Sequence, residues 1–306
     1  MMDFAGAFFD PSIVATVLRV MTPLLLASLG VMISDRAGVL NIGMEGIMLT
    51  GALTGVLVSA TTGSPWLGLL AALILCGLIG CLMAVIVNGL GAHLIITGIA
   101  LNVAASAGTA LGLYFATGDK GMSGALNSGV LPNIDLPGIA SIPIVGVVLS
   151  GHHVLTYVAL LAVPAVNIMM MRTPFGLHIR AVGVDAKSAA TTGIKVARVQ
   201  LLALMLSGVF GGAAGAYLSM GYVSWFAQDM TAGRGFIAIA IEVMGMGGAW
   251  GTLAASVVIA FAEAIAITMQ SLGMPNELMQ MIPYVIPVIV LTIWSGRKLR
   301  LAKLKN

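Results

Sequence analysis

The chain has 306 residues, of which 59% are hydrophobic and only 8% are charged, 14 of them Lys or Arg and 11 Asp or Glu. Soluble globular domains carry roughly 25% charged residues, and a mean hydropathy of +1.07 means more apolar surface than a soluble fold can shield from water. The composition therefore excludes a soluble protein and predicts a chain that lies in a lipid bilayer.

Long charge-free runs divide the chain into membrane segments. The longest run covers the 73 residues between Glu45 and Asp119, and strict alternation of polar and apolar residues is absent, which argues against a β-barrel. We therefore expect an all-α, polytopic transmembrane helical bundle of about nine segments, with a range of eight to ten. In chain order the segments are 12–33, 39–60, 66–91, 94–117, 154–171, 200–222, 235–248, 252–270 and 278–294.

Two of these segments, the first and the seventh, carry a further expectation. The first helix follows no basic n-region and no small-residue cleavage site, so we expect it to be retained and not removed as a secretory signal. The seventh segment, 235–248, is too short to cross a bilayer unless it is tilted or broken.

Ten of the fourteen basic residues fall in two clusters, and these predict the topology. Short loops rich in Lys and Arg stay cytoplasmic, which places 172–198 and the C-terminus inside. With nine segments the N-terminus then lies outside. Residues 118–151 form an external loop region, and the whole chain, 1–306, is a single transmembrane domain. Because the clusters flank membrane segments, the net charge of +3 does not indicate nucleic-acid binding. The clusters are Arg172, Arg180, Lys187, Lys195 and Arg198, and Arg297, Lys298, Arg300, Lys303 and Lys305.

Glycines four residues apart recur in the apolar segments, for example Gly208 with Gly212 and Gly211 with Gly215. Such spacings let helix backbones approach closely in lipid. Either a dimer interface or packing within the bundle would use them, and we favour packing within the bundle.

Two glycine-interrupted stretches carry charges where apolar sequence is expected. In the first, Arg36 precedes Glu45 by nine residues, and in the second, Arg234 precedes Glu242 by eight. Interrupted segments in corresponding positions of two halves are typical of inverted repeats around a transport pathway, and a carboxylate at membrane depth needs a partner or a water-filled cavity. The expected pathway or gate residues are Arg36, Asn41, Glu45, Asn102, Arg234 and Glu242.

A structural interpretation of the same charges remains open. Arg36 with Glu45, and Arg234 with Glu242, could be ion pairs that hold broken helices together. Glu263 and the amide Asn88 are weaker pathway candidates.

The first stretch resembles a signature of a known transporter family. Residues 35–51 contain Arg-Ala-Gly-Val-Leu-Asn-Ile-Gly-Met-Glu-Gly, residues 173–183 read Thr-Pro-Phe-Gly-Leu-His-Ile-Arg-Ala-Val-Gly, and 233–238 give a weaker match, Gly-Arg-Gly-Phe-Ile-Ala. These motifs are similar to those of permease subunits of ATP-binding cassette (ABC) importers for nucleosides. The same superfamily serves simple sugars and branched-chain amino acids, and the resemblance extends from about residue 17 to 297.

The resemblance implies partners and a coupling segment. Permeases of this kind lie in the bacterial cytoplasmic (inner) membrane with a second, identical or homologous permease, an ATP-binding cassette subunit and an extracytoplasmic solute-binding protein. A helix across 185–192 would dock on the ATPase, whereas an ordinary solvated loop is the alternative. The residues carried over to coupling are Arg180, Gly183, Ala186, Ala189, Ala190 and Gly193.

Other chemistries find less support in the sequence. There is no P-loop motif, so we expect no ATPase site in this chain and hydrolysis by a partner. Cys76 and Cys81 do not share a helix face, the histidines lack metal-ligand spacing, and we predict neither a metal site nor a cofactor. Ser123 has the Gly-x-Ser-Gly context of intramembrane proteases but lies in a polar loop.

The main rival to an ABC importer permease is an ion-coupled secondary transporter. A structural membrane scaffold fits the sequence poorly. The sequence leaves the solute open, and also whether the second permease is identical.

Overall fold

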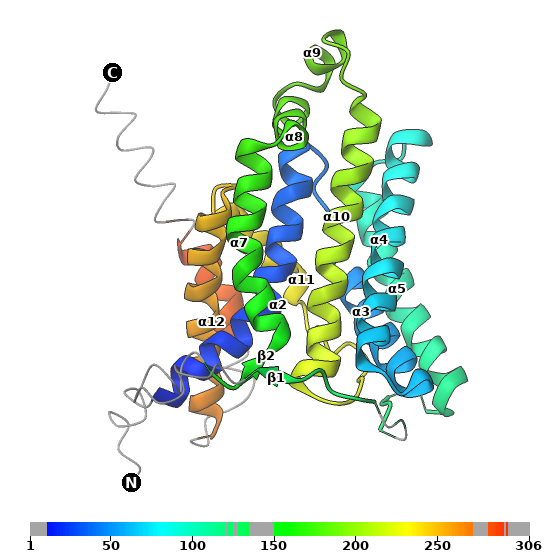
Figure 1. The fold of residues 1–306 in the computed structure, drawn as a ribbon, viewed down its shortest axis with the longest axis vertical. Coiled ribbons are helices and arrows are strands. Elements are labelled where there is room, and N and C mark those ends of the chain that lie inside the picture. The colour runs from blue at the N-terminus through cyan, green and yellow to red at the C-terminus, as the bar shows by residue number, and fades with distance from the viewer. Residues whose placement is uncertain are drawn as a thin grey trace.

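Helices make up most of the described chain, as the hydropathy pattern predicts (Figure 1). The computed structural model describes residues 11–119, 121–124, 126, 128–134, 150–271, 281–290 and 292. Seven helices in this part are long and apolar enough to cross a membrane. They are α2 (Pro11–Arg36), α3 (Met44–Thr62), α4 (Pro65–Gly89), α5 (Leu94–Thr117), α7 (Val154–Arg172), α10 (Val196–Tyr217) and α12 (Ala249–Ser271).

The remaining elements are short. Strands β1 (Asn133–Ile134) and β2 (His152–His153) form one antiparallel pair. A π-helix of five residues, η1 (Leu218–Tyr222), continues α10. The other helices are α8 (Pro174–Val184), α9 (Ala186–Thr191), α11 (Arg234–Met244) and Met281–Val290.

The expected count of nine membrane segments is not confirmed. The predicted segment 235–248 corresponds to α11, which has 11 residues. Within the predicted segment 278–294, the structure describes the shorter apolar helix Met281–Val290. At 1.5 Å per residue the 11 residues of α11 cannot cross about 30 Å of hydrocarbon. The predicted start of the second segment at residue 39 is wrong, because the chain between α2 and α3 is not helical and α3 begins at Met44.

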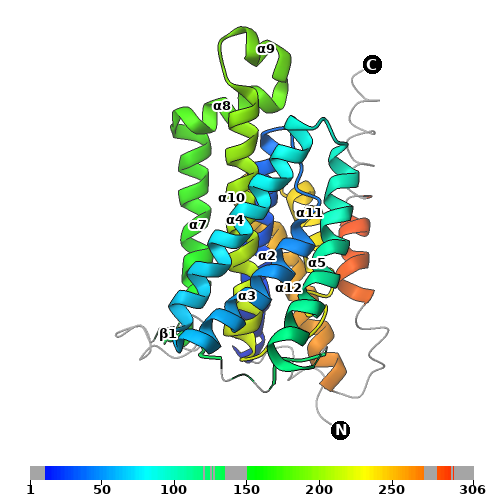
Figure 2. The ribbon, with the colours of Figure 1, turned by 90° about the vertical axis from the view of Figure 1, so that its right-hand side faces the viewer.

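The bundle has two distinct ends (Figures 1 and 2). Helices α8 and α9 project from one end, which we call the α9 end, and the β1–β2 pair lies at the other, the hairpin end. Helix α2 runs to the α9 end, after which α3 begins inside the bundle and runs toward the hairpin end. Helix α10 runs to the hairpin end, after which α11 begins inside the bundle and runs toward the α9 end.

Helix α2 is the centre of the bundle and α5 lies at its edge. In the most apolar 18-residue stretch of α2, 83% of the residues are buried, whereas in that of α5 only 17% are buried. The glycines of α10 pack within the bundle, as we favoured: a Cβ at Gly208 would collide with the carbonyl oxygen of Cys76, and one at Gly215 with that of Met48. Close backbone contacts of α10 with α4 and α3 therefore depend on these glycines.

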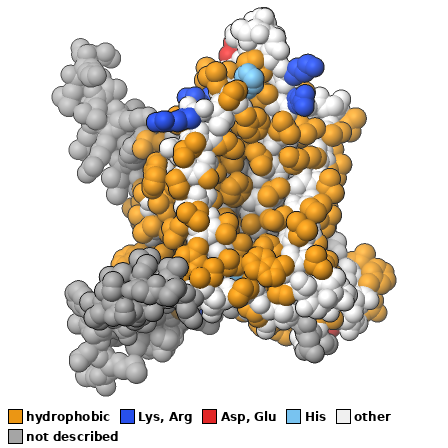
Figure 3. All heavy atoms as spheres, in the orientation of Figure 1, with side chains coloured by type: hydrophobic (Ala, Val, Ile, Leu, Met, Phe, Trp, Pro, Cys, Tyr) orange, Lys and Arg blue, Asp and Glu red, His pale blue; other side chains and the backbone are white. Residues whose placement is uncertain are grey.

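Charged side chains concentrate at the α9 end of the face in Figure 3, above a largely apolar flank. The basic residues of the first cluster lie in or beside α8, α9 and the start of α10. The second cluster, 297–305, lies outside the described residues, as do residues 135–149 of the predicted external loop region 118–151. In the described part of that loop, Ser123 is buried, and its Oγ accepts a hydrogen bond from the Phe226 N–H at 2.7 Å.

Candidate functional site

The non-helical segment 37–43 brings polar groups into the bundle. Gly38 has φ +75°, a backbone conformation that favours glycine. Asn41 is fully buried; its Nδ2 donates to Ser207 Oγ on α10 at 2.9 Å, and its backbone N–H donates to Ser34 Oγ at 3.2 Å. The predicted pathway residue Asn41 thus fixes the interruption to α2 and α10.

Asn102 of α5 supports the same interruption from the other side. Its Nδ2 donates to the Ile42 carbonyl at 3.0 Å, and its Oδ1 accepts from the Gly46 N–H at 2.9 Å. Both partners are backbone groups that an interrupted helix leaves unpaired. Asn102 is therefore a bridge between α5 and the start of α3.

Glu45, in the first turn of α3, binds the start of α11. Its Oε1 accepts from Thr231 Oγ1 at 2.6 Å and from the Gly233 N–H at 2.8 Å, and its Oε2 accepts from the Gly235 N–H at 2.7 Å. The N-terminal N–H groups of a helix carry partial positive charge and lack partners in the helix itself. A carboxylate from α3 therefore caps α11.

Two glycines make this contact possible. Gly233 has φ +77°, and a Cβ at Gly235 would come within 2.5 Å of the Glu45 Cα. No side chain fits between the two helix starts, which explains the glycines on both sides of Arg234.

Arg36 binds the opposite end of α11. Its Nε donates to the Gly247 carbonyl at 2.7 Å and its Nη2 to the Met246 carbonyl at 2.9 Å, just beyond Met244, where α11 ends. A cation is favourable at a helix C-terminus, as an anion is at its N-terminus. One short segment of the chain, 36–45, therefore holds α11 at both ends, with the charge at each end matching the helix dipole.

The ion pairs of the structural interpretation are wrong in both cases. Arg36 binds carbonyl groups and not Glu45, and Arg234 Nη2 forms an ion pair with Glu263 Oε1 at 2.6 Å and not with Glu242. Glu263 lies on α12, so the pair joins the start of α11 to that helix. Sequence spacing suggested local partners, whereas the fold supplies partners from other helices.

Replacing Glu263 with Gln is expected to destabilise the protein by about 1–2 kcal/mol, because Arg234 would keep a hydrogen bond but lose its counter-charge. The expected loss is below the ~3–5 kcal/mol of a fully buried pair, since the side chains are 24% and 12% exposed. Thermal unfolding in detergent measures it, with Asp119→Asn as a control on an exposed loop. Equal unfolding midpoints for Glu263→Gln and the native chain would contradict the prediction.

Glu242 lies near the α9 end of α11 in a cavity of about 340 Å³ that Asp35, Arg36 and Leu40 also line. Its side chain is 3% exposed, and it shares the cavity wall with the Asp35 carboxylate. The structure therefore brings Glu242 together with Arg36, and it separates both from Glu45 by the length of α11.

The segment predicted to couple to an ATPase forms two helices at the α9 end. Thr173 Oγ1 accepts from the Gly176 N–H at 3.2 Å at the start of α8, and Asp185 Oδ1 accepts from the Lys187 N–H at 3.0 Å at the start of α9. Hydrogen bonds from the Ser188 side chain and backbone lower the pKa of Asp185. The helix predicted across 185–192 is confirmed as α9.

The predicted coupling residues differ in their exposure. Ala189 is buried at 5% exposure, whereas Ala190 and Gly193 are exposed and Arg180 and Ala186 are half-buried. Gly183 is in close contact with the turn after α2: a Cβ there would collide with the Arg36 carbonyl oxygen. Gln200 Nε2 also donates to the Ala37 carbonyl at 3.3 Å. Helix α8 thus lies directly against the residue that holds α11.

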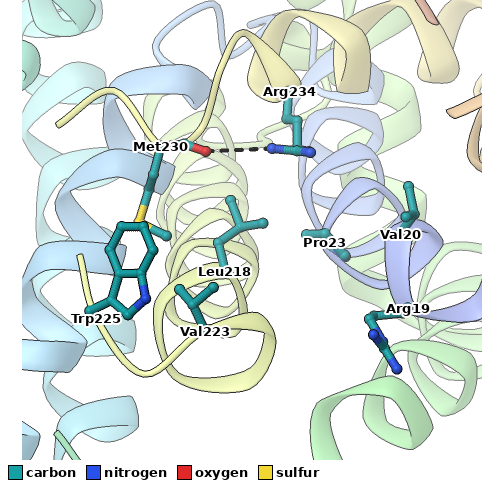
Figure 4. A pocket seen from close by; sticks show the side chains of 8 residues that line it. All are labelled: Arg19, Val20, Pro23, Leu218, Val223, Trp225, Met230 and Arg234. Atoms are coloured by element: carbon teal, nitrogen blue, oxygen red, sulfur yellow. Dashed lines mark hydrogen bonds between the residues drawn. The ribbon is translucent and has the colours of Figure 1, made fainter. Parts of the chain in front are cut away.

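Arg19 is a charged residue at the site that the sequence analysis missed. It lies on α2 and, with Arg234, lines a cavity of about 180 Å³ (Figure 4). A charge inside an apolar helix marks a functional candidate, so the signal was present in the sequence.

Comparison with known proteins identifies relatives over most of the chain. The family described as "Branched-chain amino acid transport system / permease component" matches residues 13–291. No solved structure is significantly similar.

Three named relatives are similar over most of their own length. TsgC13 of Haloferax volcanii, provisionally named a glucose ABC transporter permease protein, is 35% identical over 89% of this chain and 80% of its own. The guanosine ABC transporter permease protein NupQ of Bacillus subtilis is 32% identical over 93% of this chain and 92% of its own. The nucleoside ABC transporter permease protein NupC of Lactococcus lactis is 30% identical over the same shares.

Proposed function

Since the chain belongs to the family of branched-chain amino acid transport system permease components and is the permease subunit of an ABC transporter, we propose that it forms the membrane path of a nucleoside importer. Two of its relatives are named for guanosine or nucleosides. A relative named for glucose supports a simple sugar as the second candidate. Branched-chain amino acids, which the family description names, are a third.

One observation carries the mechanism: the α8–α9 projection touches Arg36, and Arg36 holds one end of α11. A partner that moves α8 against the Gly183 contact would therefore shift the end of α11 at Met246 and Gly247. Switching needs two packings close in energy and a partner that prefers one of them. ATP binding and hydrolysis by a cytoplasmic subunit bound at α9 would supply that preference.

The proposed membrane orientation follows the basic clusters. Residues 172–198 face the cytoplasm, 118–151 face outside, the N-terminus lies outside and the C-terminus inside, in a bacterial cytoplasmic membrane. A solute-binding protein docks at the hairpin end, and a second permease, identical or homologous, completes the path. The positive-inside rule supports this assignment, because the described basic residues of the first cluster gather at the α9 end.

We also infer an inverted repeat. In each half a long helix, α2 or α10 with its continuation η1, is followed by a non-helical segment, 37–43 or 223–233, and then by a helix that starts inside the bundle. The two units run in opposite directions (Figure 2), and their inner helix starts meet at Glu45. Arg36, Asn41, Glu45, Asn102, Arg234 and Glu242 then border the pathway or its gate, at or beside the two interruptions.

Replacing Ala190 with Trp is expected to abolish binding of the ATPase subunit, because this exposed position on α9 would lie in the contact surface. Co-purification of the ATPase from cells that express the complete transporter measures the effect. Leu90→Trp is the matched control, at an exposed position at the end of α4. Ala189 is unsuitable for this test because it is buried. Full ATPase recovery with Ala190→Trp would place the docking surface elsewhere.

Reconstituted transport tests the function itself. We expect ATP-dependent guanosine uptake into vesicles that contain the complete transporter, without comparable uptake of glucose or leucine. Preferential glucose uptake would favour the second candidate. Uptake by this chain alone without ATP, abolished by collapse of an ion gradient, would establish an ion-coupled secondary transporter instead.

A further inference from the structure

A cavity near the hairpin end lies between α2, η1 and the start of α11. Figure 4 shows Arg19 and Pro23 of α2 on one side, Trp225 and Met230 on the other, Leu218 between them and Arg234 at a third side. Its volume of about 180 Å³ is below the ~300–1,000 Å³ of sites that enclose a drug-sized ligand. The cavity therefore suits one ring system of a solute more than a whole solute.

The polar side chains around this cavity donate hydrogen bonds and accept almost none. Arg19, Arg234 and the Trp225 indole N–H are donors only, and the Met230 thioether is a weak acceptor. The Met230 carbonyl already accepts from Arg234 Nη1 at 3.4 Å. The remaining lining side chains are apolar. A ligand here must present acceptors at its edge and an apolar face to the indole.

The side chains at the cavity disfavour two of the three solute classes. The ammonium group of an amino acid would need an acceptor or a carboxylate that the lining side chains do not supply. The hydroxyls of a sugar could accept from an arginine, but a sugar has no aromatic ring to stack on the indole. Arg234 is paired with Glu263, and within the part of the chain that the structure describes, Arg19 makes no hydrogen bond or ion pair. A neutral planar ring with carbonyl and ring-nitrogen acceptors matches this combination.

We propose that this cavity is a solute subsite that takes the base of a nucleoside, stacked on Trp225 with its acceptor edge toward Arg19. The proposal rests on the proposed function and deepens it, because it places a step of solute selection in the permease. Stacking of bases on aromatic side chains tolerates any base, so the subsite would admit purines and pyrimidines alike.

Photolabelling of the complete transporter in lipid nanodiscs, without its binding protein, tests the subsite. With 8-azidoguanosine as the probe, we expect labelled peptides from 218–230, protected by excess guanosine or guanine but not by ribose or inorganic phosphate. Trp225→Ala is expected to reduce labelling about fivefold or more, as loss of a stacking partner does. Trp225→Phe should retain most of it, and Trp66→Ala, at an exposed position on α4, should retain all of it.

The outcomes separate the subsite from the function. Two results with the native chain would overturn the subsite, and neither depends on the folding of the variants. One is labelling outside this cavity, and the other is protection by ribose or phosphate as strong as that by guanosine. Guanosine uptake by the native transporter is measured independently. Uptake of guanosine with unchanged labelling in Trp225→Ala would leave the function standing and remove the subsite, whereas absence of guanosine uptake would remove the proposed function.

Discussion

Replacing Glu45 with Gln is expected to reduce solute uptake at least tenfold. The Glu45 carboxylate accepts hydrogen bonds from Thr231, Gly233 and Gly235. An amide offers one acceptor oxygen and one NH₂ donor, so at least one N–H at the start of α11 would face another donor. Hydrogen bonds to a charged group contribute about 1.5–3 kcal/mol each, and the anion also stabilises the helix dipole. Uptake into vesicles that contain the complete transporter, and thermal unfolding in detergent, measure the two effects.

Thr231→Val is the matched control for Glu45→Gln. It removes the hydroxyl donor to the same carboxylate but leaves both backbone N–H contacts and the charge. We expect a smaller loss of stability, near the roughly 1 kcal/mol of one hydrogen bond. If Glu45→Gln transports and unfolds like the native chain, then capping of α11 by α3 does not contribute to the mechanism.

Replacing Gly183 with Val is expected to uncouple ATP hydrolysis from transport. A side chain at this position would collide with the Arg36 carbonyl oxygen and push α8 away from the turn that holds α11. Overpacking of this kind costs about 1–3 kcal/mol, whereas the exposed surface of α9 is left intact. The ATPase should therefore still co-purify and hydrolyse ATP, while uptake per ATP hydrolysed falls at least fivefold.

Gly89→Val is the control for this variant, because it adds the same side chain near the end of α4. A Cβ there meets only Val85 Cγ1, at an ordinary 3.8 Å. Uptake per ATP hydrolysed should match the native value. An unchanged ratio in Gly183→Val as well would show that force does not pass from α8 to α11 through this contact.

Much of the site could be predicted from the sequence, but the partners of its charges could not. The interruptions around Arg36 and Arg234 stand out because charges and glycines break apolar runs, and Asn41, Glu45 and Glu242 fall within them. The coupling helix was predicted by resemblance and by its small residues. Glu263 was ranked low, although it is the partner of Arg234, and Arg19 was not selected.

The sequence by itself determined that this is a helical membrane protein with two interrupted segments and a basic end, because hydrophobicity, glycine and charge act locally along a chain. Only the tertiary structure decided that Glu45 and Arg36 hold opposite ends of α11, and that α8 touches the second of these contacts. The partners are backbone groups about 190 to 210 residues away. Such groups carry no side-chain signature, because every residue has the same N–H and C=O, and so only the packing of the helices could reveal them.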